Sequence, residues 1–341
     1  MKKILIAVII LAFLLSFIQP VFAGGGHYQP GYANVRDFVV PPQQKGFAVL
    51  IYNPFYWSSE YMADNGKKLQ PLTAGRSISI NNAIAVDVTA TADLNVKMFS
   101  YNVNPIFFYC SDFSILGAKY SAGIAPSYSY VHAEVDADIN AALSVNGTRV
   151  EAASRHVKVE DSDSGFGDLM VRPLMLDWGS DRYDIAFSYS FYAPTGSYER
   201  NKLANVGLGY WSHDISLGGL YYFNKKATAI LYNATYEFNS RISGQDTNPG
   251  QNLVLEYGVD QFLNKRLEVG VTGSSYFQTT DDSGSDARNK SNREMIHSVG
   301  GEADLWLIPN KFSITGRYFY QYYAENALKG QGVNVTARIL F

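Results

Sequence analysis

The sequence predicts an all-β fold, a transmembrane antiparallel up-and-down β-barrel with twelve strands. Three observations predict it: an export signal at the N-terminus, apolar–polar alternation with a period of two, and connections that alternate between long and short. After residue 23, no apolar stretch reaches the ~20 residues of a membrane-spanning helix. A chain rich in Tyr and Phe can still cross a membrane as a closed barrel, which pairs its backbone groups between strands.

The first residues have the layout of a secretory signal peptide. Lys2 and Lys3 precede an apolar run of 15 residues, 4–18, and small or moderate residues follow up to Ala23. The run is short for a membrane anchor, which needs ~20 apolar residues. We therefore expect export and cleavage after Ala23. This divides the chain into a signal peptide (1–23), a periplasmic or lumenal leader (24–45) and an outer-membrane barrel (46–341).

The strand signal is clearest at the C-terminus. Val333, Val335, Ala337, Ile339 and Phe341 fall on one face of the last segment, and mostly polar residues fall on the other. Similar alternations run over ten or more residues elsewhere, whereas strands of a soluble β-sandwich average ~5–6 residues. The terminal Phe341 resembles the last residue of bacterial outer-membrane proteins, which the barrel-assembly machinery reads, and that machinery is therefore an expected partner.

The connections support a barrel with a fixed orientation. Counted back from Phe341, whose end we place in the periplasm, six long connections alternate with five short ones, which gives twelve strands. The expected long connections are 57–76, 139–165, 194–202, 243–250, 279–292 and 324–331, and the short ones are 111–112, 179–181, 224–226, 264–265 and 309–310.

Two segments leave a count of fourteen strands possible. Residues 77–110 are too long for one crossing, so part of them projects beyond the membrane or forms an extra hairpin. Residues 203–223 change the parity of their apolar residues near Ser212 and His213, which a β-bulge explains.

Composition argues against several classes of function. The formal net charge of −3 and the lack of a basic stripe argue against nucleic-acid binding. With Cys110 as the single cysteine, no intramolecular disulfide can form. The five His are scattered, and no Gly-rich loop with Lys is present, so neither a metal nor a cofactor is predicted.

Two acidic segments, 160–165 and 281–286, carry the oxygen ligands that Ca²⁺ prefers. Neither has the spacing of a calcium loop, and we favour solvated outer loops. If they do hold divalent ions, bridging to lipopolysaccharide is the natural reason, and outer-membrane lipid and lipopolysaccharide are the expected surroundings of the barrel.

Short motifs along the chain resemble a known family. They include Gly46-Phe47 with Tyr52 and Tyr56, and longer runs at 61–69, 164–169, 191–198, 205–211 and 281–284. In this order they are similar to the family described as "Putative MetA-pathway of phenol degradation". The resemblance implies an outer-membrane barrel, often found near genes for degrading aromatic or other organic compounds. It supplies no set of binding residues.

The polar faces of the predicted strands carry charges that would be costly against lipid, ~2–4 kcal/mol for a basic side chain at mid-depth. We expect them in the lumen, as a pore lining or as a salt-bridge lattice that fills a narrow barrel. Among these charged residues, we expect Tyr276, Trp306 and Phe319 to provide apolar contacts for a compound in the lumen. With these three, the predicted lumen-lining residues are Arg172, Asp184, Glu237, Arg241, Glu256, Asp260, Glu268, Glu302, Asp304, Arg317 and Arg338.

The leading functional hypothesis is a diffusion channel for small hydrophobic or aromatic compounds, with the outer loops 139–165 and 279–292 at its mouth. The second is a structural or surface-interaction barrel whose lumen is closed by salt bridges and the leader. The third is an outer-membrane hydrolase, for which the candidates are His213 with Ser212 or Ser216, plus Asp214. Their sequence does not match the phospholipase pattern, so we predict no catalytic residues and no enzyme.

Overall fold

The structure is a computed structural model that describes residues 25–38, 45–80, 84–287 and 290–341. The predicted signal peptide, 1–23, lies outside the described residues. Two short 3₁₀ helices, η1 (Val35–Phe38) and η2 (Asp64–Gly66), accompany fifteen strands. The strands are β1 (Gly46–Met62), β2 (Leu72–Ile80), β3 (Ile84–Ile115), β4 (Ala118–Ala125), β5 (Tyr128–Val145), β6 (Thr148–Phe166), β7 (Leu169–Gly179), β8 (Tyr183–Ala193), β9 (Ser212–Phe223), β10 (Thr228–Asn239), β11 (Asn252–Phe262), β12 (Leu267–Gln278), β13 (Met295–Ile308), β14 (Phe312–Glu325) and β15 (Ala327–Leu340).

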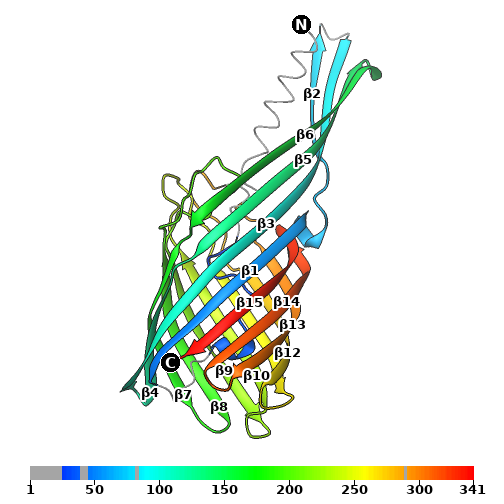
Figure 1. Ribbon diagram of the computed structural model, residues 1–341. Coiled ribbons are helices and arrows are strands. Elements are labelled where there is room, and N and C mark those ends of the chain that lie inside the picture. Colours follow the sequence, from blue (N-terminus) through cyan, green and yellow to red (C-terminus); the bar gives the residue numbers. More distant parts are fainter. Residues whose placement is uncertain (1–24, 39–44, 81–83, 288–289) are drawn as a thin grey trace.

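Twelve of these strands close into an antiparallel barrel, as the sequence predicts (Figure 1). From β7 to β15, each strand pairs with the next one in the chain. The wall continues from β7 through β4 to β3, and β1 closes it by pairing with β15 on one side and β3 on the other. No helix among the described residues is long and apolar enough to cross a membrane.

The three remaining strands form a sheet that projects from one end of the barrel (Figure 1). β3 is 32 residues long, and its first half pairs with β2 and β5, while β6 pairs with β5. β5 follows β4 after two residues, and β7 follows β6 after two residues. The first part of β3 projects beyond the barrel and pairs antiparallel with β2 as an extra hairpin. Both explanations for the length of segment 77–110 are therefore correct.

We call the projecting end the loop end and the opposite one, which holds the C-terminus, the turn end (Figure 1). Five short connections lie at the turn end: 116–117, 180–182, 224–227, 263–266 and 309–311. The first replaces the turn predicted at 111–112, because β3 continues to Ile115 and the positive φ of Leu116 (52°) and Gly117 (79°) make the turn there.

Two predicted outer loops are strands instead. Residues 139–165 form most of β5 and β6, and the hairpin turns at Asn146 and Gly147, whose φ angles are 49° and 79°. Residues 324–331 lie almost entirely in β14 and β15, which are joined by Asn326. Apolar and polar residues alternate only weakly in both segments. The sequence therefore predicted loops, although the backbones of these segments form strand pairs.

The expected β-bulge near Ser212 and His213 is also wrong. β8 ends at Ala193, and residues 194–211 form a loop before β9 begins at Ser212. The change of apolar parity therefore marks the start of a strand and not a bulge within one. We call residues 194–211 the strap, because they lie across the junction of β6 and β7, where Gly196 lies against Gly167 and Asp168, and Gly207 lies against Gly196.

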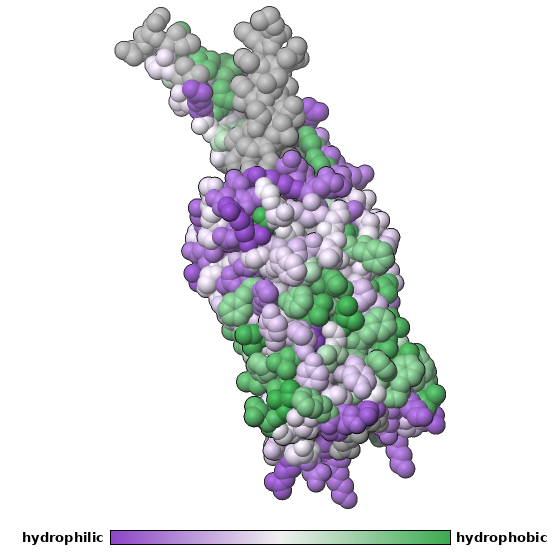
Figure 2. Space-filling view, turned by 90° about the vertical axis from the view of Figure 1, so that its left-hand side faces the viewer, coloured by the Kyte–Doolittle hydropathy of each residue, from purple (hydrophilic) through white to green (hydrophobic). Residues whose placement is uncertain are grey.

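The outer face of the barrel is a continuous apolar surface. Side chains that point outward include Phe47 (60% exposed), Val271 (60%) and Leu217 (57%). On the face of the barrel that Figure 2 shows, apolar residues gather in the part nearer the turn end, with hydrophilic residues on either side along the barrel. This apolar belt has the arrangement expected for contact with lipid, and the alternate residues of each strand are left for the lumen.

Candidate functional site

Residues 25–38, which we call the leader segment, run inside the barrel from the loop end to the turn end (Figure 1). His27 contacts Asp168 and Ser212 near the loop end. Asp37 contacts Arg338 and accepts a hydrogen bond from the Tyr52 hydroxyl (2.6 Å) near the turn end. The segment therefore occupies part of the lumen along its length.

Three wall carboxylates hold the backbone of the leader segment. Glu237 accepts the Tyr28 N–H (2.9 Å), Glu256 accepts the Gly31 N–H (3.1 Å) and Glu302 accepts the Val35 N–H (3.0 Å). Buried backbone N–H groups need partners, and an ionised carboxylate is a strong acceptor for them. These acids therefore dock the leader segment and do not form a lining of free charges.

Arg36 is the main cation that the leader segment brings into the lumen. Its guanidinium forms ion pairs with Asp260 (3.0 Å) and Glu268 (2.5 Å), and it lies 4.8 Å from the centre of the Phe262 ring. Asp260 and Glu268 are almost fully buried. Without Arg36 they would be neighbouring buried carboxylates with no cation, which is strongly unfavourable.

Two wall arginines fix the rest of the leader segment. Arg317 donates to the Ala33 carbonyl oxygen and pairs with Glu302 (3.3 Å). Arg338 pairs with Asp37 and with Asp304 (3.3 Å). The charges at this side of the lumen are thus arranged as a lattice between wall and leader.

His27 joins the start of the leader segment to the wall. Its Nε2 lies 2.8 Å from Asp168 Oδ2, its Nδ1 lies 2.7 Å from Ser212 Oγ, and its ring stacks on Tyr192 at 4.7 Å. The order Asp–His–Ser resembles a hydrolase triad. However, Ser212 is fully buried and its hydroxyl donates to Asn239 Oδ1 (2.7 Å), so Ser212 is a hydrogen-bonding anchor for His27 and not an accessible nucleophile.

The residues proposed for a hydrolase are not brought together. His213 faces outward and bonds the Tyr189 hydroxyl (2.8 Å). Ser216 faces inward and bonds Thr235 (2.8 Å). Because adjacent positions of a strand point to opposite faces, odd-numbered His213 cannot act on even-numbered Ser212 or Ser216 within β9.

The structure places most of the predicted lumen residues inside the barrel. Trp306 lies under the Arg338 guanidinium, 5.5 Å from its carbon, and Phe319 packs edge-on against Tyr32. The others that face inward are Arg172, Asp184, Glu237, Glu256, Asp260, Glu268, Tyr276, Glu302, Asp304, Arg317 and Arg338. Arg241 does not line the lumen as predicted. β10 ends at Asn239, and the exposed Arg241 side chain pairs with Asp246 in the following loop.

Several site residues were missed. His27, Arg36 and Asp37 belong to a leader without alternation, and nothing in their spacing indicated contact with the wall. Asp168 lies between β6 and β7, within a segment expected to be near a loop. Asp214 was singled out only as a hydrolase candidate; its place on the inner face of β9 could be deduced only once the strand start at Ser212 is known.

A cavity of about 490 Å³ remains beside the leader segment. Its wall is formed by the inward residues of β1, β3, β7 and β8, such as Tyr52, Asn102, Phe108 and Ser188. Other rings along it are Tyr28, Tyr32, Phe38, Tyr56, Tyr192 and Phe319. This size suits a ligand with one or two aromatic rings, and the lining combines apolar surface with a few polar groups.

An apolar cluster closes the turn end of the lumen. Phe38, the last residue of η1, packs against it together with Ile106 and Leu340. Its buried members are Val35, Ala48, Leu50, Tyr52, Phe108, Cys110, Met175, Ala186, Leu220, Tyr222, Ala229 and Leu231. Passage from the cavity to the turn end therefore requires the leader segment to move at Phe38.

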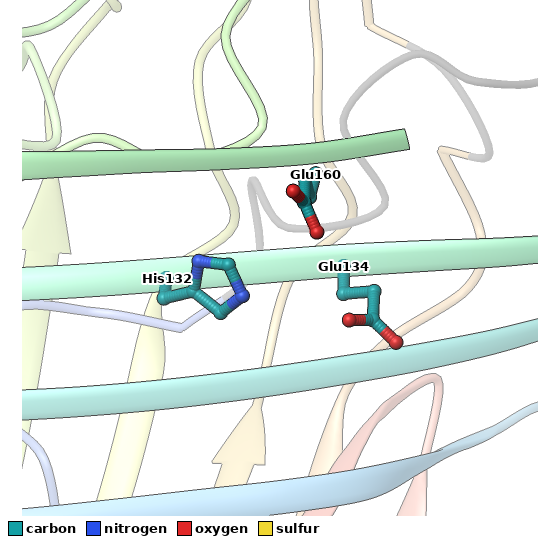
Figure 3. Close-up of side chains that lie close together, drawn as sticks. All are labelled: His132, Glu134 and Glu160. Carbon is teal, nitrogen blue, oxygen red and sulfur yellow. The ribbon is translucent and has the colours of Figure 1, made fainter. Parts of the chain in front are cut away.

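A group with metal-ligand atoms lies on the projecting sheet. Atoms of His132 and Glu134 on β5 and Glu160 on β6 lie within 4.8 Å of one another (Figure 3). Lys97 lies 2.6 Å from Glu134, and Lys158 lies 2.8 Å from Glu134 and 3.0 Å from Glu160. The two lysines already neutralise these carboxylates, so the group is an ion-pair cluster of strand neighbours.

The predicted acidic loops bind backbone N–H groups. Asp161 accepts the Leu203 (3.0 Å) and Ala204 (3.2 Å) amides, so residues 160–165 belong to β6 and hold the strap. In the second segment, Asp282 accepts the Gly250 amide (2.8 Å). Nearby, the Ser285 N–H and hydroxyl hydrogen bonds, with Arg241, lower the pKa of Asp246 to about 2. These carboxylates tie loops together.

Comparisons with known proteins agree with this architecture. The family described as "Putative MetA-pathway of phenol degradation" matches residues 74–337. An outer-membrane channel from Pseudomonas putida F1 is similar in structure, with a TM-score of 0.59, 13% sequence identity, and coverage of 91% of this chain and 100% of that chain. At this identity the likeness shows the fold. The CymD monoaromatic hydrocarbon channel gives a TM-score of 0.41 at 9% identity, with coverage of 95% and 97%. No curated protein matches the sequence.

Proposed function

This chain belongs to the phenol-degradation family whose match spans residues 74–337, and we propose that it is an outer-membrane channel for small hydrophobic or aromatic compounds. The observation that carries the proposal is the ring-lined cavity beside the leader segment. Compounds diffuse along this cavity, and the leader segment shifts at Phe38 to let them leave at the turn end. The similar structure from Pseudomonas putida F1 is named an outer-membrane channel, which supports a channel function, and the family description supports an aromatic cargo.

The lumenal charges have a different role from the one expected of a pore lining. We assign Glu237, Glu256, Asp260, Glu268, Glu302, Arg317 and Arg338 to holding the leader segment. Asp184 accepts a hydrogen bond from the Tyr222 hydroxyl (2.5 Å) and belongs to the turn-end closure. Arg172 and the aromatic residues then remain for the cargo.

The cellular setting completes the proposal. Export depends on cleavage after Ala23, and the mature chain, leader included, resides in the outer membrane among lipid and lipopolysaccharide. The barrel-assembly machinery reads the last strand, whose exposed Phe341 pairs its N–H with the Phe47 carbonyl (2.9 Å) at the barrel seam. We propose no cofactor and no catalytic activity.

Uptake by intact cells tests this function. Cells that degrade toluene in the cytoplasm, and that lack general porins, are compared with and without this chain. Faster toluene consumption at low external concentration supports the channel, provided that disrupted cells of both strains consume toluene equally. Equal consumption by intact cells, for toluene and for every other aromatic compound tried, would overturn it.

One observation favours a second candidate, a barrel without transport. The leader segment and its ion pairs fill one side of the lumen, and Phe38 with its cluster closes the turn end. A barrel that never opens would serve as a structural or surface-interaction protein through its projecting sheet. Planar-bilayer recordings separate the two: discrete conductance steps exclude the closed barrel, and silence under all voltages and aromatic solutes favours it.

A further inference from the structure

Arg172 differs from the other cations that lie in the lumen. Arg36, Arg317 and Arg338 each pair with a carboxylate. All the Asp and Glu of the chain lie within the described residues, and none of them forms an ion pair with Arg172. Its Nε donates to Ser190 Oγ (2.8 Å), and the structure gives its two terminal nitrogens no partner among the described residues. The free N–H donors of a guanidinium can form two parallel hydrogen bonds to an anion, which accepts them.

Arg172 also faces the cavity. It lines the cavity from β7, and its guanidinium carbon lies 5.8 Å from the centre of the Phe108 ring on β3. Phe108 on β3 and Ser190 on β8 thus contact a side chain that is itself part of the cavity lining. This is the position from which a bound molecule could be contacted.

The other charges along the cavity are occupied or distant from its centre. Asp168 pairs with His27, and Asp37 pairs with Arg338. Glu294 lies at the loop end, just before β13. Arg172 is the one arginine or lysine among the described residues that line this cavity, and aromatic and small polar side chains line it as well.

One carboxylate of the lumen whose charge interacts with Arg172 is Asp214. It pairs across the strands with Ser190, so it lies one strand beyond the residue that Arg172 bonds. Its Oδ1 is buried without a hydrogen-bond partner among the described residues. A purely structural role for Arg172, balancing the charge of Asp214 at longer range, is therefore the explanation that a test must separate from ligand binding.

We propose that Arg172 forms an anion subsite of the channel, and that the preferred cargo is an aromatic carboxylate. This rests on the proposed function and names its substrate class. The carboxylate accepts two hydrogen bonds from the terminal nitrogens of Arg172, and the ring of the cargo packs beside Phe108. A guanidinium matches a carboxylate in a bidentate pair, while the aromatic lining supplies edge or offset ring contacts. A neutral aromatic compound uses the rings alone.

Binding of a matched pair of compounds tests the subsite. Calorimetry on the folded barrel in detergent compares benzoate with benzyl alcohol, which has a similar size and no charge. The wild type should bind benzoate more tightly. Arg172→Met should weaken benzoate binding by about ten- to a hundredfold, as expected for a lost charge-assisted pair, and change benzyl alcohol by less than about twofold. Arg172→Lys should recover only part of the loss, since it keeps the charge without the fork.

Two further variants make the result decisive. Arg241→Met removes an exposed loop arginine and should leave both affinities unchanged. The double variant Arg172→Met/Asp214→Asn removes the charge of Arg172 and that of Asp214. If benzoate binding stays weak in it, ligand binding by Arg172 is supported; if it returns to the wild-type value, Arg172 only balances Asp214 and the subsite is overturned. Benzoate affinity that is unchanged in Arg172→Met also overturns it. If neither compound binds the wild type, the proposed function fails before the subsite is reached.

Discussion

His27 of the leader segment and Asp168 of the barrel wall lie 2.8 Å apart, between Nε2 and Oδ2, with both side chains almost fully buried. Asp168 also accepts the Gly196 and Leu208 amides, both at 2.8 Å. One carboxylate therefore holds the start of the leader segment and the strap together. This contact makes the position of the leader segment depend on the strap above it.

The first prediction concerns release of the leader segment at the loop end. His27→Ala removes the contacts with Asp168 and Ser212 and leaves the buried Asp168 without one of its hydrogen-bond partners, which is unfavourable. We expect more frequent or larger conductance steps in planar bilayers than in the wild type. His156→Ala, which alters an exposed histidine on the projecting sheet, should not change conductance. Equal conductance in all three proteins would show that His27 does not restrain the leader segment.

The second prediction concerns the charge lattice. Arg36→Met leaves Asp260 and Glu268 without their shared cation, a loss of about 3–5 kcal/mol for a buried pair. Since the strand pairing is untouched, we expect the leader segment to leave the lumen while the barrel stays folded. Proteinase K should then remove the N-terminal residues faster than in the wild type.

Charge compensation provides the control for that result. In Arg36→Met/Asp260→Asn/Glu268→Gln, no uncompensated charge remains at this place, and resistance to proteinase K should partly return. Cleavage that stays as fast as in the single variant would mean that Arg36 holds the leader segment by packing on Phe262 and Tyr222 and not by charge.

The third prediction concerns the glycines at the contact between the strap and the junction of β6 and β7. A Cβ on Gly196 would lie 2.8 Å from Gly207 Cα and 3.0 Å from the Gly167 carbonyl carbon. Gly196→Ala should therefore displace the strap and lower stability by about 1–3 kcal/mol, the usual range for overpacking. Gly316→Ala is the matched control, because a Cβ there has no neighbour within 4 Å. The temperature at which the barrel loses its folded gel mobility measures both, and equal temperatures would refute the close packing.

The fourth prediction concerns the lipid-facing belt. Val271 is 60% exposed on β12. Val271→Arg should cost about 2–4 kcal/mol of folding free energy in lipid vesicles if it lies near mid-membrane, and less toward the interface. Leu116→Arg, in a turn-end connection, should cost little. Similar urea midpoints for both variants would argue that the belt does not contact lipid.

Much of the barrel was predictable from the sequence. Each strand of the wall faces apolar lipid on one side and a more polar lumen on the other, which imposes a period of two on its residues. The twelve strands of the wall and four of the five turns follow from that period. The hairpin of β5 and β6 was not predictable, since strands with solvent on a face do not need apolar residues there. Its polar stretch 160–165 therefore looked like loop.

The site was only partly predictable. Alternation places Glu256 and Arg338 on an inner face, but it does not say what they contact. The partners, Tyr28, Gly31 and Asp37, come from a segment more than 200 residues away in the chain without secondary-structure periodicity. Such contacts depend on the path of the leader through the closed lumen, which no local pattern records.

The central claim is that aromatic compounds pass through the cavity beside the leader segment, and blocking that cavity tests it most directly. Asn102 on β3 lines the cavity, whereas its neighbour Val103 lies on the opposite face of the same strand. In the porin-deficient, toluene-degrading cells, Asn102→Trp should reduce consumption to the level of cells without the chain. Val103→Trp, folded and expressed equally, should retain the wild-type rate. Undiminished consumption with Asn102→Trp would contradict the account, because the compounds would then cross by a route other than this cavity.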